Sequence, residues 1–478
     1  MNGAQQALDR LHAIGSESRP MSSITPGALA AEVLALLEHP GFDALPPDQR
    51  GGAFFRILLL YSGSWQAEGQ ALIPAAERAF ARLVADAPGD LTALCNGYDC
   101  LCFLHWCRTA TIEEQAGFGR NVVSPFAAAI RATAPLRGKD GGRRAGIGYL
   151  AEFVTPGPGN AIAGANRVVL EALAAGREAP IFLYAWMFHD PETVAAYAAR
   201  GVQVRTVEGN SPAERIAKLE EAIAADRPEV LISDMNASVP AVLYERRSAP
   251  VQVLYQFGMP HWPLVNLDAV FRVWEFEPAL AGYDATRCIT LTIPYDLRPF
   301  QRAADSAALA AERARLPPGR LVGTYGRLAK ITPAFVRAVA DGIRDHGDVV
   351  AAFGGSGDPG PVRAAIEAVG LADRMLVLDG YVDGHLWGHM LDVFLDTFPQ
   401  PGGASCLEVI AKGKPVVSFE TPEARNLARE ERVPALRAKT EGEYSAILSR
   451  LLGDAAAYAE ACAATCRLAA SYPTAKRY

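Results

Sequence analysis

The sequence contains no apolar run of the roughly 18 residues that are needed to cross a bilayer. Its first ten residues, Met1 to Arg10, also lack the basic segment and apolar core of a secretory signal. With 50% hydrophobic and 21% charged residues, the 478-residue chain has the balance of a globular protein rather than a disordered or fibrous one. We therefore expect a cytoplasmic protein with no membrane partner.

Dense runs of one charge are also absent. Lysine and arginine occur as isolated pairs, such as Arg143-Arg144 and Arg246-Arg247, which are interpreted as solvated surface. The formal net charge is -7 at pH 7, whereas a protein that binds nucleic-acid phosphates usually carries a basic patch. The sequence therefore predicts no nucleic-acid partner.

Cysteine is sparse, at eight residues, and no two of them form a Cys-x-x-Cys pair. Cys95, Cys100, Cys102 and Cys107 cluster, and a metal site that combines the last three with His105 is one interpretation. The surrounding stretch is apolar and helical in pattern. The sequence therefore favours reduced thiols packed in a core, and we expect no metal.

Apolar residues at spacings of three and four dominate the first 140 residues and predict an all-α domain. The predicted helices are Pro26–Leu37, Gly51–Tyr61, Glu68–Asp86, Leu91–Trp106 and Ser124–Thr133. Ala76, Phe80 and Pro88 keep the spacing of one helix of a tetratricopeptide repeat, but no second copy is found. The domain is therefore either a degenerate repeat or a plain helical bundle, and in both cases it is a candidate platform for a protein partner.

A polar, glycine-rich stretch, Pro135–Arg144, marks the boundary to a region in which strands and helices alternate. Two such series follow, separated near Leu316–Arg320. In the first, Ser211 as N-cap and Pro212 at the first helical position predict a helix that runs to Ala225. They predict two Rossmann-like halves, 141–317 and 318–478, each with a parallel sheet, and the second half ends in a terminal helix. The predicted fold class is α/β, with the all-α domain 1–140 in front.

The stretch from Leu395 to Phe419 has the pattern of a strand, a glycine-rich turn, a helix and a second strand, and its apolar runs predict the strands at Val393–Leu395 and Val416–Phe419. Prolines and glycines at four positions prevent regular structure in the turn: Pro399, Pro401, Gly402 and Gly403. Ser405 is the predicted helix N-cap, with Glu408 at the spacing of a capping box. The free backbone N–H groups of such a helix start favour phosphate binding, and a loop that only turns the chain is the alternative.

This stretch resembles the nucleotide-sugar site of glycosyltransferases of the O-linked N-acetylglucosamine transferase and SPINDLY group, in which Leu-Asp-Thr-Pro or Leu-Asp-Thr-Phe-Pro precedes a glycine-rich helix start. Three further stretches are similar to segments of that family and occur in its order: Gly148–Leu150, Ser248–Pro260 and Tyr325–Pro333. The resemblance covers about residues 144 to 455. It implies a GT-B fold, in which two Rossmann-like halves meet and the second holds most of the donor.

The resemblance implies a nucleotide-sugar co-substrate, with a UDP-sugar favoured, and no other cofactor. No Asp-x-Asp triplet, the metal-binding signature of many transferases, occurs in the chain, so protein groups must stabilise the leaving phosphate. The implied phosphate ligands are Lys330, Arg327 and the backbone of Gly402, Gly403, Ala404 and Ser405. Glu408 would accept from the ribose hydroxyls. Tyr381, Val382 and His385 would contact the base, and surface positions are the alternative for Lys330 and His385.

The acceptor side departs from the family, because Gly157 and Ser238 stand where the family has histidines. Neither residue accepts a proton at neutral pH. His261, in the Gly-Met-Pro-His stretch, is the remaining candidate base, with Asp234 behind it. Asn236 is a candidate for orienting the sugar or the acceptor.

The sequence therefore predicts an inverting, metal-independent glycosyltransferase that moves a hexosyl or N-acetylhexosaminyl group from a nucleotide diphosphate to a protein Ser or Thr hydroxyl. The acceptor protein is expected to dock partly on the all-α domain. The resemblance extends to bacterial adhesin glucosyltransferases, so transfer to asparagine is an alternative. The missing histidines leave a third interpretation, a scaffold that binds the nucleotide-sugar without turning it over.

Overall fold

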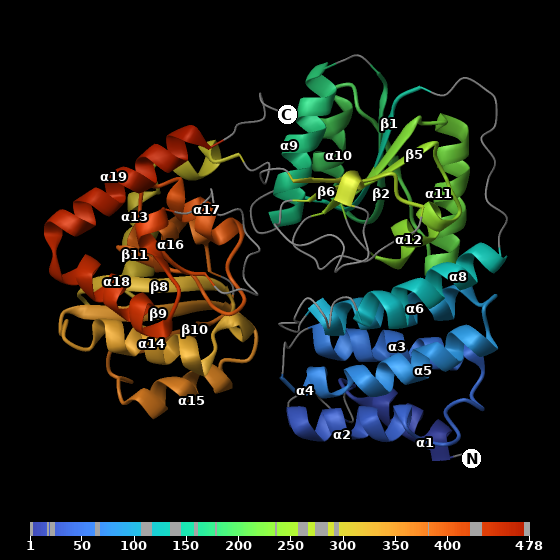
Figure 1. Cartoon of the computed structure of the whole chain (residues 1–478), viewed down its shortest axis with the longest axis horizontal. Coiled ribbons are helices and arrows are strands. Elements are labelled where there is room, and N and C mark those ends of the chain that lie inside the picture. The colour runs from blue at the N-terminus through green and yellow to red at the C-terminus, as the bar shows by residue number, and fades with distance from the viewer. Residues whose placement is uncertain are drawn as a thin grey trace. The chain divides into compact units, whose positions relative to one another are not determined.

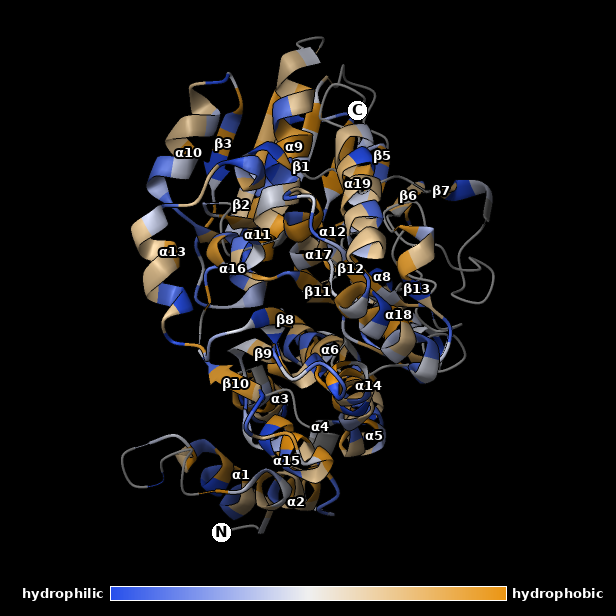
Figure 2. Cartoon of the chain, turned by 90° about the vertical axis from the view of Figure 1, so that its left-hand side faces the viewer, coloured by the Kyte–Doolittle hydropathy of each residue, from blue (hydrophilic) through white to orange (hydrophobic). Residues whose placement is uncertain are grey.

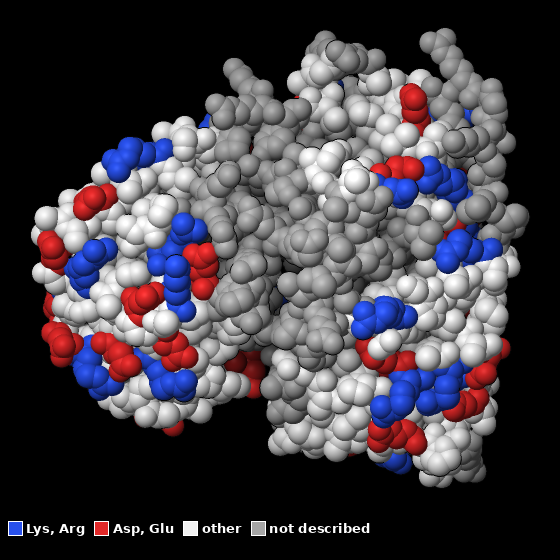
Figure 3. Space-filling model, viewed as in Figure 1, with Lys and Arg blue, Asp and Glu red and all other residues white. Residues whose placement is uncertain are grey.

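The computed structural model of the chain describes residues 3–16, 19, 24–62, 67–106, 117–133, 145–156, 161–176, 179–234, 237–256, 266–272, 285–290, 296–380, 382–420 and 433–472. Its internal contacts divide the chain into two compact units (Figure 1). The first unit comprises Met1–Arg272 and Glu277–Leu291, and the second comprises Val273–Phe276 and Thr292–Tyr478. Basic and acidic side chains are interspersed over the described part of the face drawn in Figure 3.

The first unit begins with a layer of helices. These are α1 (Gly3–Ala13), α2 (Pro26–Leu37), α3 (Pro47–Ser62), α4 (Ala67–Ala71), α5 (Ile73–Asp86), α6 (Leu91–Trp106) and α8 (Ser124–Thr133), the last preceded by a π-helical turn, η2 (Gly119–Val123). The single helix predicted over Glu68–Asp86 is wrong, because α4 ends at Ala71 and α5 begins at Ile73. Pro74 has no backbone N–H to donate and sits in the first turn of α5, which makes it a helix start.

The cysteine cluster lies inside this helical layer. Cys95, Cys100 and Cys102 are buried in α6, and the ring atom Nε2 of His105 lies 2.9 Å from Glu77 Oε1 of α5. Cys107 lies outside the described residues. Among the described residues, the structure contains no group of three His, Cys, Asp or Glu side chains that could hold a metal ion. None of the helices in the same ranges is long and apolar enough to cross a bilayer.

A parallel sheet follows in the first unit, with its strands in the order β3-β2-β1-β4-β5-β6-β7. The strands are β1 (Ile147–Val154), β2 (Ile181–His189), β3 (Gln203–Thr206), β4 (Val230–Ser233), β5 (Val251–Gln256), β6 (Ala269–Arg272) and β7 (Cys288–Thr290). Between them run α9 (Ala161–Gly176), α10 (Pro191–Ala198), α11 (Pro212–Asp226), α12 (Ser238–Glu245) and the 3-10 turn η3 (Ala285–Arg287). As predicted, Ser211 caps α11 by accepting from the Glu214 N–H, and Pro212 occupies the first helical turn.

Buried polar contacts join the helical layer to this sheet. Helices α6 and α8 pack against α12, whose N-cap residue, Ala237, has no side-chain acceptor. The Asp99 carboxylate of α6 takes that role, because it accepts from both the N–H and the hydroxyl of Ser238 at 2.7 Å. Arg131 of α8 donates to the fully buried Glu245 at the other end of α12. The helical layer and the first Rossmann-like half therefore share one core.

The second unit contains another parallel sheet, with strand order β10-β9-β8-β11-β12-β13. The strands are β8 (Arg320–Arg327), β9 (Val349–Ser356), β10 (Met375–Asp379), β11 (Val393–Leu395), β12 (Val416–Phe419) and β13 (Arg437–Ala438). The helices are α13 (Ser306–Arg313), α14 (Pro333–Ile343), α15 (Gly360–Val369), α16 (Gly384–Met390), α17 (Ala404–Ile410), α18 (Glu441–Gly453) and α19 (Ala455–Ser471), with 3-10 turns η4 (Arg298–Gln301), η5 (Leu328–Lys330) and η7 (Pro434–Leu436).

Helices cover both faces of the second sheet. One apolar core includes Phe335 of α14 and Leu448 of α18, and the other includes Trp387 of α16 and Leu407 of α17. Figure 2 shows apolar strands such as β10 and β11 in orange, whereas α13 also carries hydrophilic residues in blue. Two parallel sheets flanked by helices, with an all-α layer in front of the first, confirm the predicted α/β fold class. In such sheets, ligands bind at the carboxyl ends of the strands.

Candidate functional site

The loop after β11 folds back on its own first residue. The backbone N–H of Gly402 donates to Asp396 Oδ1 at 2.5 Å, and the Thr397 hydroxyl donates to the carbonyl of Gln400 at 2.7 Å. Asp396 is buried beneath the loop. A Cβ at position 402 would lie 2.9 Å from Ser405 Oγ and 3.1 Å from Asp396 Oδ1, so glycine permits this close approach.

The helix after this loop begins two residues earlier than an N-cap at Ser405 would place it. Gly403 is the N-cap of α17 and makes no side-chain capping bond, so the prediction that Ser405 is the N-cap is wrong. Ser405 is instead the second residue of the helix. The reason is local, because the backbone of Gly403 adopts φ −105° and ψ −98° and turns the chain into the helix without a capping side chain. The backbone of Gly402, Gly403, Ala404 and Ser405 thus forms the tip of the turn.

Lys330 reaches this loop from β8. It ends the 3-10 turn η5, and its Nζ donates to the carbonyl of Pro401 at 2.9 Å. Burial and then the charge of Arg327 lower the pKa of Lys330 to about 8, while Asp396 opposes the shift. Arg327 is the last residue of β8. The structure therefore brings Lys330 to the glycine-rich loop, and Arg327 lies close enough to Lys330 for its charge to act on that amine.

Glu408, the predicted ribose ligand, is held by a tyrosine. The Tyr325 hydroxyl donates to Glu408 Oε2 at 2.9 Å and lies 3.4 Å from the carbonyl oxygen of Ser405. The Tyr325 ring packs edge to face against Phe394, with centroids 5.4 Å apart. A Cβ on Gly384 would stand 2.6 Å from Glu408 Oε2, so the start of α16 approaches this carboxylate closely. The carboxylate therefore has a fixed position beside the loop.

The predicted base-contacting residues stand at the start of α16. Asp383 is the N-cap and accepts from the N–H of His385 at 2.8 Å, and Val382 packs against the core under α16. Burial lowers the pKa of His385, and the nearby Lys412 charge adds to this, so the imidazole is neutral at pH 7. Tyr381 lies outside the described residues.

Asp234 directly follows β4 in the first unit and is 1% exposed. Its Oδ2 accepts from the Asn166 amide of α9, and Asn166 Oδ1 accepts from the Tyr149 hydroxyl at 2.8 Å. Burial raises the pKa of Asp234 to about 7. His261, the predicted base, lies outside the described residues, as do Gly157 and Asn236. Ser238 donates to Asp99 of the helical layer and so has a structural contact.

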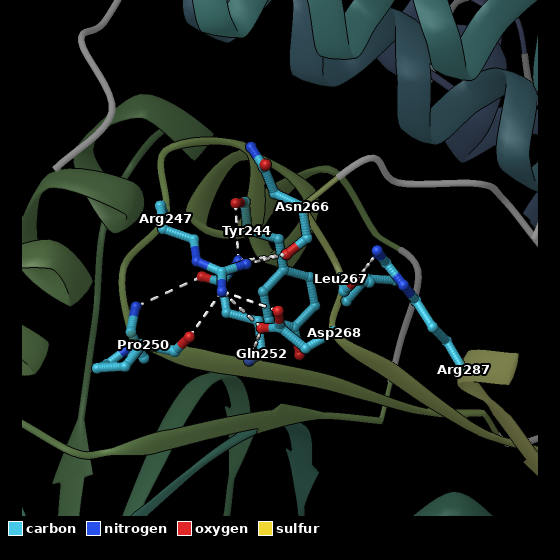
Figure 4. Close-up of polar contacts among 9 residues, drawn as sticks. Tyr244, Arg247, Pro250, Gln252, Asn266, Leu267, Asp268 and Arg287 are labelled. Atoms are coloured by element: carbon cyan, nitrogen blue, oxygen red, sulfur yellow. Dashed lines mark hydrogen bonds and ion pairs between the residues drawn. The ribbon is translucent and has the colours of Figure 1, made fainter. Parts of the chain in front are cut away.

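The Ala-Pro-Val-Gln stretch before β5 has a structural role. Gln252 is fully buried and donates through Nε2 to the carbonyls of Tyr244 and Asn266, at 2.9 and 2.8 Å. Arg247 donates to the carbonyl of Asn266 at 2.9 Å and to Asp268 at 2.8 Å. Figure 4 shows both side chains bridging the turns before β5 and β6. These contacts lie at the amino ends of the strands, opposite the edge where a ligand would bind.

Comparison with solved structures finds proteins with a similar fold. A mutant of the O-GlcNAc transferase from Thermobaculum terrenum is similar with a TM-score of 0.56 and 18% identity, over 98% of this chain and 94% of that one. Anabaena HepE in complex with UDP and glucose gives a TM-score of 0.52 and 16% identity, over 70% of this chain and 97% of that one. The chain has the GT-B fold. A glycosyltransferase from Rickettsia africae gives a TM-score of 0.53 and 12% identity, over 70% of this chain and 96% of that one. No protein-family profile and no curated protein sequence matches the chain.

Within the GT-B fold, two groups emerge that the sequence analysis did not assign to a site. The first is the Tyr325 hydroxyl, which donates to Glu408. In the sequence, Tyr325 was noted only as part of the Tyr325–Pro333 stretch. The second is Glu152, in β1: burial, and then the charge of Asp234, raise the pKa of its carboxyl group to about 8. A signal for Glu152 was present, since it is a carboxylate within an otherwise apolar strand, Ile147–Val154.

Proposed function

We propose that this chain is an inverting, metal-independent glycosyltransferase of the O-linked N-acetylglucosamine transferase and SPINDLY-like group. It transfers a sugar from a nucleotide diphosphate, a UDP-sugar being favoured, to a Ser or Thr hydroxyl of a cytoplasmic protein. The observation that carries the proposal is the contact of Lys330 Nζ with the Pro401 carbonyl, at 2.9 Å, which holds a cation in the glycine-rich loop at the carboxyl edge of the sheet. The complex of Anabaena HepE with UDP and glucose supports the choice of UDP.

Each donor-side residue has one role in this proposal. Lys330 and Arg327, together with the N–H groups of the turn from Gly402 to Ser405, bind the diphosphate. Glu408 accepts from the ribose hydroxyls, and Tyr325 orients it. The segment Tyr381, Val382 and His385 contacts the base. Because bond cleavage leaves negative charge on the phosphate, fixed cations and N–H donors in this place stabilise the transition state more than the ground state.

We assign the acceptor-side residues to the first unit. His261 takes the proton of the acceptor hydroxyl, with Asp234 behind it, and the acceptor protein docks partly on the helical layer. The similarity to the Thermobaculum terrenum O-GlcNAc transferase extends over 98% of this chain and so includes this layer. Asp99 and Arg131 fix the layer to the first sheet, so a docked protein would be held in a defined position.

Donor affinity is expected to depend on pH through Lys330. The pKa of Lys330 is lowered to about 8, so its charge is present below that pH and is lost as the pH rises through it, whereas an unperturbed lysine stays charged to about 10.4. The affinity for UDP should therefore fall by up to about tenfold per pH unit above pH 8. Calorimetry from pH 6.5 to 9.5 measures this. Lys330→Arg should bind UDP with a flat profile, and a flat wild-type profile would contradict the assignment.

Metal removal is expected to leave turnover unchanged, because the proposal gives the leaving-group charge to Lys330, Arg327 and backbone N–H groups. The measurement is the initial rate of donor consumption before and after dialysis against EDTA. Loss of the rate with recovery on addition of Mg²⁺ or Mn²⁺ would overturn the metal-independent part of the proposal.

The direct test is an assay of purified protein with UDP- and GDP-sugars, followed by mass spectrometry of proteins from cells with and without this chain. Consumption of a UDP-sugar together with a new mass on Ser or Thr peptides is the expected result. The same mass on asparagine would favour the adhesin-type reaction. Tight UDP binding with no consumption of any donor would favour a scaffold.

A further inference from the structure

Helix α12 of the first unit is buried along its whole length. All eight of its residues, Ser238–Glu245, are buried, and the helix packs against α6 and α8 of the helical layer and against α11. The Tyr244 hydroxyl of α12 donates to the carbonyl of Val253 in β5 at 2.7 Å. Because such a helix has little access to water, protein groups must accept from the N–H groups of its first turn.

The residues at the start of α12 do not provide a side-chain acceptor of their own. The N-cap residue, Ala237, has an extended backbone, with φ −70° and ψ 165°, but its methyl side chain makes no capping bond. The first backbone bond of the helix runs from the Ala241 N–H to the Ala237 carbonyl at 3.1 Å. Since Pro240 has no N–H, the first turn has two N–H groups that need an acceptor from outside the helix, those of Ser238 and Val239.

The helical layer provides the acceptor for Ser238. Asp99 of α6 accepts from its backbone N–H and from its hydroxyl, each at 2.7 Å. Burial raises the pKa of Asp99 to about 6, while the hydrogen bonds from Ser238 and the charge of Arg215 oppose the shift. The Asp99 carboxyl group is therefore ionised at pH 7, and its charge lies at the end of α12 where the helix dipole favours an anion.

The same layer places the opposite charge at the other end of α12. Arg131 of α8 donates to Glu245, which is the last residue of the helix and is fully buried. A buried carboxylate beside the C-terminal carbonyls of a helix is unfavourable unless a cation accompanies it. Asp99 and Arg131 therefore hold α12 at its two ends, and we call these two contacts the clamp.

The clamp fixes one end of a short connection at the carboxyl edge of the first sheet, where ligands of such sheets bind. Strand β4 ends at Ser233 and α12 begins at Ser238, so residues 234–237 join the two elements. Asp234, the first of these four residues, accepts from the Asn166 amide of α9. The connection is therefore anchored by α9 at its beginning and by Asp99 of the helical layer at its end.

We propose that Asp99 is a positioning residue of the acceptor side, because by capping α12 it sets the course of the connection that carries Asp234. This inference rests on the proposed function, in which Asp234 stands behind the base. The helical layer is then part of the framework of the acceptor site, in addition to its role in docking the acceptor protein. Asp99 takes no part in donor binding, since the residues assigned to the donor belong to the second unit.

The first test is hydrogen exchange of the unliganded full-length protein, measured by mass spectrometry. In Asp99→Ala, the amides of α12 should exchange about 3- to 30-fold faster than in the wild type, which is the scale for the loss of a helix cap. The amides of β8, in the second unit, should be unchanged. The matched control is Asp48→Ala, which removes an exposed carboxylate from the first turn of α3 and should leave α12 unchanged.

A rescue variant separates capping from other effects of Asp99. Ala237→Ser places a capping hydroxyl at the N-cap position of α12, so adding it to Asp99→Ala should slow the exchange of α12 again. Exchange of α12 at the wild-type rate in Asp99→Ala, or no recovery on adding Ala237→Ser, would overturn the clamp whatever the activity.

The second readout is the rate of transfer from the UDP-sugar that the wild type consumes, measured beside the affinity for UDP. Asp99→Ala should lose about 10- to 100-fold in rate, the scale for a slightly misplaced catalytic group, while UDP affinity stays within about twofold. Adding Ala237→Ser should recover most of the lost rate. A rate like that of Asp48→Ala, or an equal loss of rate and UDP affinity, would overturn the positioning role.

Ser238→Ala keeps the test open if Asp99→Ala does not fold. It removes one of the two hydrogen bonds to Asp99 and keeps the other, which comes from the backbone N–H. Its changes in exchange and in rate should have the same direction and a smaller size, and values equal to the wild type would overturn the proposal. A wild type that consumes no donor would instead refute the proposed function, while hydrogen exchange still decides the clamp.

Discussion

Lys330→Ala is expected to slow sugar transfer by about two to three orders of magnitude, which is the scale for the loss of one preorganised group that stabilises transition-state charge. The Lys330 amine already lies in the loop, 2.9 Å from the Pro401 carbonyl oxygen. It therefore needs to move little when a donor phosphate replaces that carbonyl as its partner. Most of the loss should appear in kcat, because the leaving phosphate gains its charge only as the bond breaks. Initial rates over a range of UDP-sugar concentrations measure both constants.

Two further variants separate charge from position. Lys330→Arg keeps the cation but changes its shape, so it should retain part of the rate. Lys439→Ala makes the same truncation at an exposed site of the second unit and should have the wild-type rate. If Lys330→Ala stayed within twofold of the wild type, Lys330 would have no part in the mechanism.

Glu408→Gln is expected to weaken UDP binding by about one to two orders of magnitude, because hydrogen bonds to a charged group contribute roughly 1.5–3 kcal/mol. The carboxylate is fixed by the Tyr325 hydroxyl, at 2.9 Å, so it is prepared to accept from a ribose diol. Calorimetry with UDP and with its 2′-deoxy and 3′-deoxy analogues tests this directly. The wild type should discriminate against at least one deoxy analogue, and Glu408→Gln should bind UDP and that analogue equally.

Tyr325→Phe is the companion variant, because it removes the donor that orients Glu408 but keeps the ring that packs against Phe394. It should show a smaller loss of UDP affinity and partial discrimination between UDP and the deoxy analogues. Full discrimination in Glu408→Gln would assign the ribose to other groups and limit Glu408 to its contact with Tyr325.

Local patterns in the sequence were enough to place many elements of the fold. The apolar runs predicted strands with the bounds of β11 and β12, Val393–Leu395 and Val416–Phe419, because a short run between turn residues has few other structures available. Ser211 followed by Pro212 likewise predicted where α11 begins. Where two local signals competed the prediction was wrong, because Gly403 caps α17 in place of Ser405 and Pro74 starts a new helix inside Glu68–Asp86.

The sequence also determined the α/β class, the glycine-rich loop and the presence of Lys330 beside it. Only the tertiary structure decided which side chains meet: Tyr325 and Glu408 are 83 positions apart, and Ser238 and Asp99 are 139 apart. Such contacts depend on strand order and register, which no local periodicity encodes. The same holds for Glu152 and Asp234, since β1 and β4 become neighbours only when the sheet is assembled. Burial of Glu152 near Asp234, which raises the pKa of Glu152, is likewise decided by the assembled sheet and not by the apolar pattern of β1.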